Sequence, residues 1–354
     1  MNILSLSNDK QILDINSSVA GRIMTYGELV NNFVVLVPNR VDLKLELSKK
    51  VVVWGIGGNN KIWQFYKLYI KAGELLKNKN YQVITSQDTY FLGLLGYLLA
   101  KKYHLGLELQ FHGVEKMAGL RKIISKYILP KANSVRTVSQ SLKSILMDEF
   151  SVVENKIVVI PIYVAPCTNI EHLENNSKTF IFITACRLVP IKRVEWQIKA
   201  INNLKELSVE LWIVGEGSEK NKLENLVKGY NLESKVKFLG WQNKEQLCDL
   251  YKQANCYILS SVNEGWGMAT VEASYHQLPI IMTNVGCARE VFKNGESALI
   301  VESLDELIGA MKNIFANLEL RKKLVAGAIG ELNKLPDQEQ TLNLYLTSLK
   351  KAVI

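Results

Sequence analysis

The chain has 354 residues, of which 48% are hydrophobic and 22% charged, a composition typical of a soluble globular protein and unlike that of a disordered chain. The longest apolar run, residues 91–100, is about half as long as a membrane span must be, and polar residues at 8–10 argue against a signal peptide. The formal net charge of +9 sits in the first half, since residues 1–163 contain 21 Lys and Arg against 12 Asp and Glu, whereas residues 164–354 contain 22 of each.

This one-sided charge favours an anionic partner, such as a lipid headgroup, a phosphate-bearing acceptor or a nucleic acid. A solvated, lysine-rich surface is the alternative, and it is the favoured one because such charge runs are usually solvated faces.

Short apolar segments alternate with helix-period stretches through the first half of the chain. We expect strands near residues 2–6, 33–37, 51–54, 81–85, 107–112, 134–138 and 157–160. A helix over residues 120–128 would have an apolar face beside basic residues, formed by Leu120, Ile123, Ile124, Tyr127 and Ile128 and by Arg121, Lys122 and Lys126. Core packing with a solvated basic face is favoured over docking on an anionic membrane.

The same alternation continues in the second half, with strands expected near residues 180–185, 209–214, 236–239, 256–260, 279–282 and 298–301. Several are nearly continuous apolar runs, as strands of buried parallel sheets are. Helices are expected over residues 244–253 and 304–317, with Asn243 and Ser303 as their caps. Because thirteen strands are too many for one ordinary sheet, we predict an α/β protein with two doubly wound, Rossmann-like domains.

The domain boundary is expected within residues 161–178, which hold two prolines and several asparagines. We therefore divide the chain into domains over residues 1–163 and 164–335. Residues 336–354 form a last helix that we expect to pack back on the first domain.

Five cysteines occur, at positions 167, 186, 248, 256 and 287, and no two have metal-binding or C-x-x-C spacing. This favours buried thiols in a reducing cytosol over a disulfide framework or a zinc site. There is no D-x-D pair, and the four histidines are not spaced as metal ligands. We therefore predict neither a bound metal nor a resident cofactor.

Residues 184–193 form an apolar strand followed by a short loop that holds Arg187 and Lys192. In a parallel sheet, both cations would lie at the carboxyl end of this strand, where they suit a diphosphate. Ordinary surface cations are the alternative.

The next strand is followed by Gly215-Glu216-Gly217. Glycines at this turn would let the backbone approach a nucleotide, but a tight turn alone would account for them equally well.

Residues 256–273 predict a strand, a glycine-containing loop and a helix that begins near Gly267 or Met268. Amides at residues 267–270 would point toward an anion at the helix N-terminus. Glu264 lies in the loop and Glu272 falls one or two turns into the helix, so both carboxylates can contact one extended ligand. A loop-surface glutamate and a solvated helix residue are the alternative.

Together these three segments, in this order, resemble the retaining glycosyltransferases of family 4 (glycosyl transferases group 1), which have the GT-B fold. Arg187 and Lys192 match the arginine and lysine of the family, Gly215 and Gly217 match its G-x-G turn, and Glu264 and Glu272 match its E-x7-E motif. The resemblance implies two Rossmann-like domains that face a central cleft, an N-terminal acceptor domain and a C-terminal domain that binds a nucleotide sugar.

The resemblance also implies roles for these residues. Arg187 and Lys192 would bind the donor diphosphate and stabilise the leaving nucleotide, Glu264 would lie near the anomeric carbon, and Glu272 would bind the ribose hydroxyls. Other donor contacts would come from Trp241 beside the base and from Gly265, Trp266, Gly267, Met268, Ala269 and Thr270 around the phosphate and sugar. The departing diphosphate gains negative charge while the sugar gains positive charge, which suits an Arg–Lys pair and a carboxylate.

In the first half, residues 87–94 and 110–113 resemble acceptor-side segments of the family. His112 ends an apolar strand, so we include it among the catalytic residues with Glu264, Lys192 and Arg187. A structural histidine is the alternative.

The predicted function is a retaining, metal-independent transfer of a hexose from a nucleotide-diphosphate sugar to a glycan or lipid-linked acceptor, in cell-surface polysaccharide or glycolipid synthesis. We expect a cytoplasmic protein at the inner face of the membrane, in peripheral contact with anionic lipid and not with nucleic acid. The alternatives are a nucleotide-sugar epimerase of the same fold and a non-catalytic basic module that binds membrane or nucleic acid.

Overall fold

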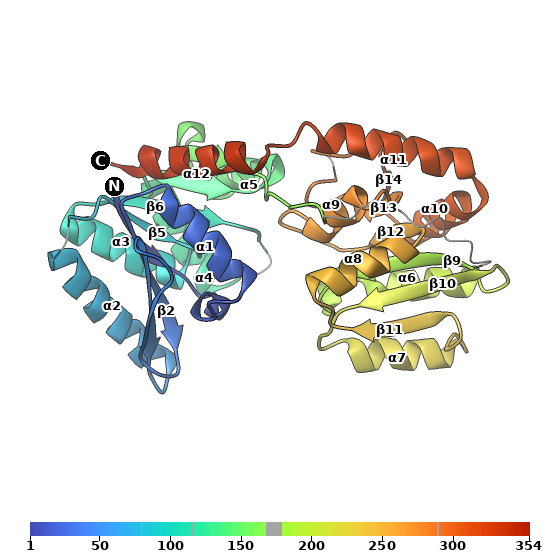
Figure 1. The fold of residues 1–354 in the computed structure, drawn as a ribbon, viewed down its shortest axis with the longest axis horizontal. Coiled ribbons are helices and arrows are strands. Elements are labelled where there is room, and N and C mark those ends of the chain that lie inside the picture. Colours follow the sequence, from blue (N-terminus) through green and yellow to red (C-terminus); the bar gives the residue numbers. More distant parts are fainter. Residues whose placement is uncertain (79, 115–116, 168–178, 289) are drawn as a thin grey trace. The chain divides into compact units, whose positions relative to one another are not determined.

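The structure is a computed structural model that describes residues 1–78, 80–114, 117–167, 179–288 and 290–354. The chain divides into two compact units, each with its own parallel sheet (Figure 1). Unit 1 consists of Met1–Pro161 together with Asp337–Ile354, and unit 2 consists of Ile162–Pro336. The expected boundary residues 169 and 175–177 lie outside the described residues.

Unit 1 contains an eight-stranded sheet in the order β3-β4-β2-β1-β5-β6-β7-β8. All neighbours are parallel except β3, which pairs antiparallel with β4. The strands are β1 (Asn2–Leu6), β2 (Asn32–Asn39), β3 (Leu43–Glu46), β4 (Val51–Gly57), β5 (Val83–Ser86), β6 (Gly106–Phe111), β7 (Ser134–Thr137) and β8 (Ile157–Val159). The sequence predicts seven of them and misses β3, whose four residues alternate between half-buried and exposed because the strand lies at the sheet edge.

Helices cover both faces of this sheet. They are α1 (Ser18–Glu28), α2 (Lys61–Asn78), α3 (Phe91–Tyr103), α4 (Leu120–Ile128), α5 (Gln140–Asp148) and α12 (Gln338–Ala352), with short 3-10 turns η1 (Lys10–Leu13), η2 (Leu129–Lys131) and η3 (Glu154–Lys156). Neighbouring helices α2, α3 and α4 contact one another in that order. Tyr26 of α1 stacks on Tyr345 of α12, with ring centroids 4.1 Å apart.

The C-terminal helix α12 contacts β6 and β7 through a buried polar cluster. Glu108 on β6 is fully buried, and its two carboxylate oxygens accept hydrogen bonds from Thr85 at 2.5 Å and from Ser348 of α12 at 2.6 Å. Arg136 on β7 lies 3.5 Å from the same carboxylate and 4.4 Å from the Tyr345 ring. A buried charge of this kind requires partners, and here they come from β5, β7 and the C-terminal helix α12.

Unit 2 contains a six-stranded, fully parallel sheet in the order β11-β10-β9-β12-β13-β14. Its strands are β9 (Phe180–Ala185), β10 (Val209–Val214), β11 (Val236–Gly240), β12 (Cys256–Leu259), β13 (Ile280–Thr283) and β14 (Leu299–Val301). Its helices are the 3-10 turn η4 (Pro190–Lys192), α6 (Val194–Asn203), α7 (Lys220–Gly229), α8 (Lys244–Gln253), α9 (Met268–Tyr275), α10 (Leu304–Ala316) and α11 (Leu318–Leu332). The predicted caps are confirmed, since Asn243 forms a capping box with Gln246, and Ser303 accepts a hydrogen bond from Glu306 N–H.

The structure corrects the favoured interpretation of α4. Its apolar stripe does not pack into the core, because Leu120, Ile123 and Tyr127 are 62%, 66% and 54% exposed. Only Ile128 is fully buried, and Ile124 is half-buried. Periodicity shows which side chains share a helix face, but it does not show which face the sheet covers.

None of the helices that the structure describes combines the length and the apolar character needed to cross a bilayer.

Candidate functional site

The candidate site in unit 2 lies beside β9, where the order in which successive strands join the sheet reverses. Strand β9 has β10 on one side and β12 on the other, and ligands of doubly wound sheets bind at the carboxyl ends of such neighbouring strands. The loop after β9 holds Arg187 and Lys192, and the loop after β12 holds Glu264. The two loops are joined directly, because Val262 N–H donates to the Ile191 carbonyl at 2.8 Å.

An ion pair connects the two predicted motifs. Lys192 Nζ lies 2.5 Å from Glu264 Oε1, and the two side chains are 14% and 11% exposed. Ser261 Oγ donates to the same Glu264 oxygen at 2.7 Å. Each charge therefore has a partner, although the residues are 72 positions apart in the chain.

Buried hydroxyl and amide groups hold this pair of loops in place. Ser260 Oγ lies 2.9 Å and 3.0 Å from the carbonyl oxygens of Lys192 and Arg193, and Gln197 Nε2 donates to Ser260 Oγ at 2.9 Å. Thr283 Oγ1 donates to the Ser261 carbonyl at 2.7 Å. These residues were not predicted from the sequence, where their only signal is that polar side chains follow buried strands.

The predicted charges also affect the pKa values of two side chains close to the site, Cys186 and Tyr257. Burial raises the pKa of the Cys186 thiol to about 11, while Lys192 and Arg187 oppose the rise and Glu264 adds to it. Burial also raises the pKa of Tyr257, and both Glu264 and Glu272 add to this rise. The structure thus places Arg187, Lys192 and Glu264 in the segments that follow β9 and β12 and Glu272 on α9, with Arg187 exposed and the other three half-buried.

The turn Gly215-Glu216-Gly217 follows β10 and packs against the loop that carries Arg187. Leu188 N–H donates to the Glu216 carbonyl at 2.9 Å. A Cβ at Gly215, where φ is +130°, would lie 1.9 Å from the Cys186 oxygen, and one at Gly217 would lie 2.2 Å from the Leu188 oxygen. Both glycines therefore allow close approach of protein backbone, which accounts for them without a nucleotide.

We expect Gly215→Ala to destabilise the protein by about 2–4 kcal/mol, because the new methyl group meets a backbone oxygen at a positive φ. Gly229→Ala is the matched control, since nothing lies within 4 Å of a Cβ built at the end of α7. Urea or thermal unfolding of both variants measures the difference. Equal stability of the two variants would show that the turn relaxes freely and does not hold the Arg187 loop.

Helix α9 begins where the sequence predicts, with Gly267 as its N-cap at φ +94°. The Thr270 N–H already donates to the Gly267 carbonyl at 3.0 Å, so it is not available to an anion in this state. The amides of Gly267, Met268 and Ala269 remain as the expected hydrogen-bond donors to an anion. Gly265, in the loop before them, is half-buried. Trp266 as a whole residue is 3% exposed, so its ring has almost no surface to offer a ligand.

Glu272 lies on α9, half-buried, and burial raises its pKa while Lys244 at the start of α8 opposes the rise. Trp241 follows β11 directly and is 73% exposed. The end of β11 is close to the glycine turn after β10, because Gly215 N–H donates to the Gly240 carbonyl at 2.7 Å. Trp241 therefore stands beside this turn with its ring available for contact.

A segment that the sequence analysis missed supports the Glu264 loop. Residues 284–288 follow β13, and Cys287 N–H donates to the Trp266 carbonyl at 2.8 Å. A Cβ at Gly286, where φ is +59°, would lie 2.4 Å from the Trp266 oxygen and 2.9 Å from Glu264 Cβ. Gly286 after a buried strand is the one signal that could have indicated this contact.

In unit 1, the two predicted acceptor-side segments meet in one pocket of about 190 Å³. The pocket is lined by Gln87, Asp88, Thr89, Tyr90, Gln110, Phe111, His112, Gly113 and Met117. Asp88 has a structural role here, because its carboxylate accepts from the N–H groups of Tyr90, Leu92 and Gly93 at the start of α3.

His112 stands at this pocket as an exposed residue, with Nε2 3.3 Å from Gln110 Oε1. Desolvation, followed by the charges of Arg136 and Arg22, lowers the pKa of His112 to about 4. All three causes favour the uncharged ring, so the imidazole is neutral at neutral pH and is a weak base that can accept a hydrogen bond.

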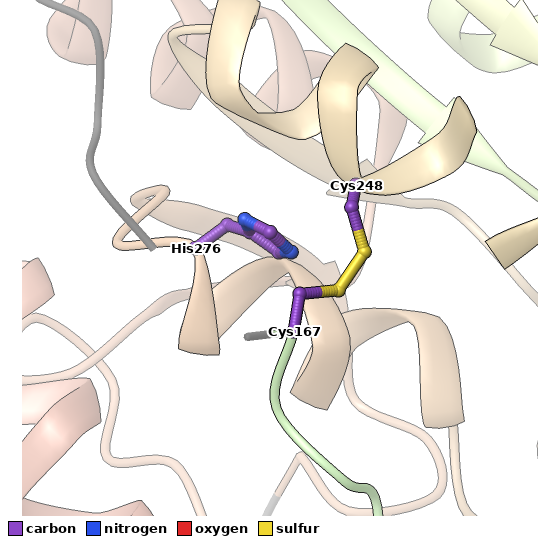
Figure 2. A group of neighbouring side chains, drawn as sticks. All are labelled: Cys167, Cys248 and His276. Atoms are coloured by element: carbon purple, nitrogen blue, oxygen red, sulfur yellow. A yellow bond between two sulfur atoms is a disulfide. The ribbon is translucent and has the colours of Figure 1, made fainter. Parts of the chain in front are cut away.

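Two of the five cysteines are not thiols, contrary to the sequence analysis. Cys167 and Cys248 form a disulfide, and His276 lies beside it (Figure 2). The pairing was not evident because 81 positions separate the two residues and only the placement of α8 brings them together. The two sulfurs and the His276 ring lie close enough together to be considered as metal ligands. Because the sulfurs are bonded to each other, they cannot act as thiolate ligands, and the group does not form a metal site while the disulfide is intact.

Comparison with protein families gives two matches along the chain. The family described as Glycosyltransferase Family 4 matches residues 30–165, and the family described as Glycosyl transferases group 1 matches residues 168–330.

Individual proteins agree with these matches. The uncharacterized glycosyltransferase MJ1178 of Methanocaldococcus jannaschii is 26% identical over 256 residues, which cover 71% of this chain and 70% of that protein. The UDP-N-acetylglucosamine–peptide N-acetylglucosaminyltransferase GtfA subunit of Streptococcus parasanguinis is 29% identical over 180 residues, which cover 49% of this chain and only 34% of that protein. The solved structure of Anabaena Alr3699/HepE in complex with UDP-glucose matches 100% of both chains with a TM-score of 0.78 at 16% identity, which shows a shared fold, the GT-B fold.

Proposed function

This chain belongs to family 4 of the glycosyltransferases, and from that premise we propose that it is a retaining hexosyltransferase that uses a nucleotide-diphosphate sugar. The acceptor is a glycan or a lipid-linked sugar, and the reaction serves cell-surface polysaccharide or glycolipid synthesis. The observation that carries the proposal is the half-buried Lys192–Glu264 ion pair at the carboxyl ends of β9 and β12.

In this proposal the donor rearranges the ion pair. A diphosphate brings negative charge that competes with Glu264 for Lys192, and Arg187 on the same loop supplies a second, exposed cation. Glu264, kept in orientation by Ser261, then faces the sugar. As the sugar–phosphate bond breaks, the two cations stabilise the leaving diphosphate and the carboxylate stabilises the positive charge on the sugar.

We propose that these two cations take the place of a divalent metal. We also propose that the amides of Gly267, Met268 and Ala269 at the start of α9 bind phosphate, that Glu272 binds the ribose, and that Trp241 flanks the base. The glycine turn at Gly215 and Gly217 acts indirectly, by supporting the loop that holds Arg187.

For the donor we propose a uridine-diphosphate sugar, because two similar proteins carry such a donor in their names, UDP-N-acetylglucosamine in one and UDP-glucose in the other. For the acceptor, we propose that the 190 Å³ pocket of unit 1 binds it, with the neutral His112 ring accepting a hydrogen bond from an acceptor hydroxyl. We place the protein at the cytoplasmic face of a membrane, where the Cys167–Cys248 bond would be open to reduction.

The test is a thermal-shift screen of UDP, GDP and ADP sugars with the full chain. A donor at 100 times its Kd stabilises the folded state by about 2.7 kcal/mol, so UDP sugars should raise Tm by several degrees and the others should not. With the best donor, sugar transfer to added glycan should proceed in EDTA, and NMR should show the anomeric configuration of the donor retained in the product. Stabilisation by no nucleotide sugar, or conversion of the donor into its epimer without transfer, would refute the proposal.

A further inference from the structure

The outer face of three neighbouring helices in unit 1 carries an unusual share of the exposed apolar side chains. Helices α2, α3 and α4 follow strands β4, β5 and β6, and α3 contacts both α2 and α4. Among the described residues, twenty large apolar side chains are exposed, and nine of them lie on these three helices. They are Ile62, Trp63, Tyr66 and Ile70 on α2, Phe91 and Leu98 on α3, and Leu120, Ile123 and Tyr127 on α4.

The most exposed of these residues gather at one end of the three helices. Ile62 is 85% exposed, Ile123 is 66% exposed and Leu120 is 62% exposed, and all three lie in the first turns of their helices. Trp63 and Phe91 occupy first turns as well. Because the preceding strands are parallel, these first turns lie at the same edge of the sheet, so the apolar side chains form one patch there. Contiguous patches of this kind mark interaction surfaces.

The same three helices carry cations along their length, with Lys61 and Arg121 in the first turns beside the patch and Lys77, Lys101 and Lys102 in the last turns. The three helices contain nine lysines and arginines and one carboxylate, Glu74. Lys67 pairs with Asp42 and Lys122 pairs with Glu149, both from neighbouring segments. Counting Glu74 and both of these partners, the three helices as a whole keep an excess of six positive charges, which is most of the +9 of the whole chain.

Cationic and aromatic groups are also in direct contact at this face. Arg121 lies over the Tyr90 ring at 5.2 Å, and Lys131 lies over the Tyr127 ring at 3.6 Å. On α2, the Trp63 and Tyr66 rings stack 5.3 Å apart. Tyrosine and tryptophan rings with lysines beside them are the side chains that settle at the boundary between headgroups and acyl chains.

We propose that this outer face of α2, α3 and α4 docks unit 1 on a bilayer that contains anionic lipids. Lysines and arginines bind the headgroups, while Ile62, Trp63, Leu120 and Ile123 enter the acyl boundary. A nucleic acid would match the charge but would leave the exposed aliphatic side chains without a partner. The inference deepens the proposed function, since it places the acceptor domain where lipid-linked acceptors lie, but its test needs no nucleotide and no transfer.

The experiment is co-sedimentation of the full chain with phosphatidylcholine vesicles made with and without phosphatidylglycerol. We expect binding to the vesicles that contain phosphatidylglycerol, weakened by salt, and little binding to phosphatidylcholine alone. Because each cation near an anionic surface contributes about 1 kcal/mol, the pair Arg121→Gln with Lys126→Gln should lower the partition coefficient by about thirtyfold. The pair Leu120→Ser with Ile123→Ser should lower it by tenfold or more.

The matched control carries Leu318→Ser and Lys323→Gln on α11, an exposed apolar and an exposed basic residue of unit 2, and should bind like the wild type. Circular dichroism and Tm of each variant confirm folding, which is expected because the substituted residues are exposed. A wild-type chain that stays in the supernatant would overturn the proposal, as would equal binding by all variants. Loss of binding only in the charge pair would also overturn it, because it would indicate a polyanion site without insertion into lipid. Binding of UDP sugars by unit 2, measured separately, reports on the proposed function alone.

Discussion

Lys192→Met is expected to lower kcat for sugar transfer by about 10²–10³-fold, the loss seen when one preorganised group that stabilises transition-state charge is removed. Methionine keeps most of the side-chain volume but cannot neutralise the leaving diphosphate. It also leaves the Glu264 carboxylate, 11% exposed, without its 2.5 Å partner. Initial rates of nucleotide release with the best donor measure the effect.

Lys205→Met is the matched control, because Lys205 is an exposed cation that follows α6, away from the carboxyl ends of the strands. It should retain the wild-type rate. Glu264→Gln should lose activity to a similar degree, since glutamine keeps a partner for Ser261 but carries no charge toward the sugar. Because both residues act on one charge separation, the double variant should be little slower than the slower single variant. Wild-type rates for Lys192→Met and Glu264→Gln would show that this ion pair is structural.

Glu108→Ala is expected to destabilise the protein by about 3–5 kcal/mol, the cost of removing one partner of a buried ion pair. Burial works against the charge of Arg136, but Glu108, together with Tyr345 and Tyr26, outweighs this effect, so the pKa of Arg136 is raised. Without Glu108, a cation that is only 8% exposed loses its counter-charge, and the hydroxyls of Thr85 and Ser348 lose their acceptor. The midpoint of thermal or urea unfolding measures the loss.

Two further variants separate this effect from general damage. Glu149→Ala removes an exposed ion pair with Lys122 and should cost less than about 1 kcal/mol. The double replacement Glu108→Leu with Arg136→Met should recover much of the stability, because it leaves no buried charge uncompensated. A single Glu108→Ala variant as stable as the wild type would show that Arg136 finds other partners, and α12 would then be held by its apolar contacts alone.

The sequence predicted the sheets of both units from residue pattern. Strands such as Phe180–Ala185 and Val209–Val214 have the predicted bounds, because a strand buried on both faces must be apolar at nearly every position. Edge strand β3 was not predicted because half of its residues are exposed to solvent. The motifs around Arg187, Lys192, Glu264 and Glu272 were also evident, since the first three residues lie in segments that follow buried strands and Glu272 comes eight positions after Glu264.

Contacts between segments that are distant in the chain could not be predicted from the sequence. Nothing in the spacing of Glu108 and Ser348, which are 240 positions apart, indicates that a hydrogen bond joins them. The same holds for the disulfide of Cys167 and Cys248 and for Gly286, which supports the Glu264 loop. These contacts depend on how elements pack, and packing choices are not encoded in any one segment.

By itself, the sequence determined the α/β class, the order of strands and helices, and the charged residues that mark the carboxyl ends of β9 and β12, because burial and helix capping act within a few neighbouring residues. Only the tertiary structure decided that Lys192 and Glu264 neutralise each other, that the glycine turn supports the Arg187 loop, and that the apolar stripe of α4 faces outward. The physical reason is that hydrogen bonds, ion pairs and burial depend on distances in space, and a chain of 354 residues brings positions far apart in sequence within 3 Å of each other.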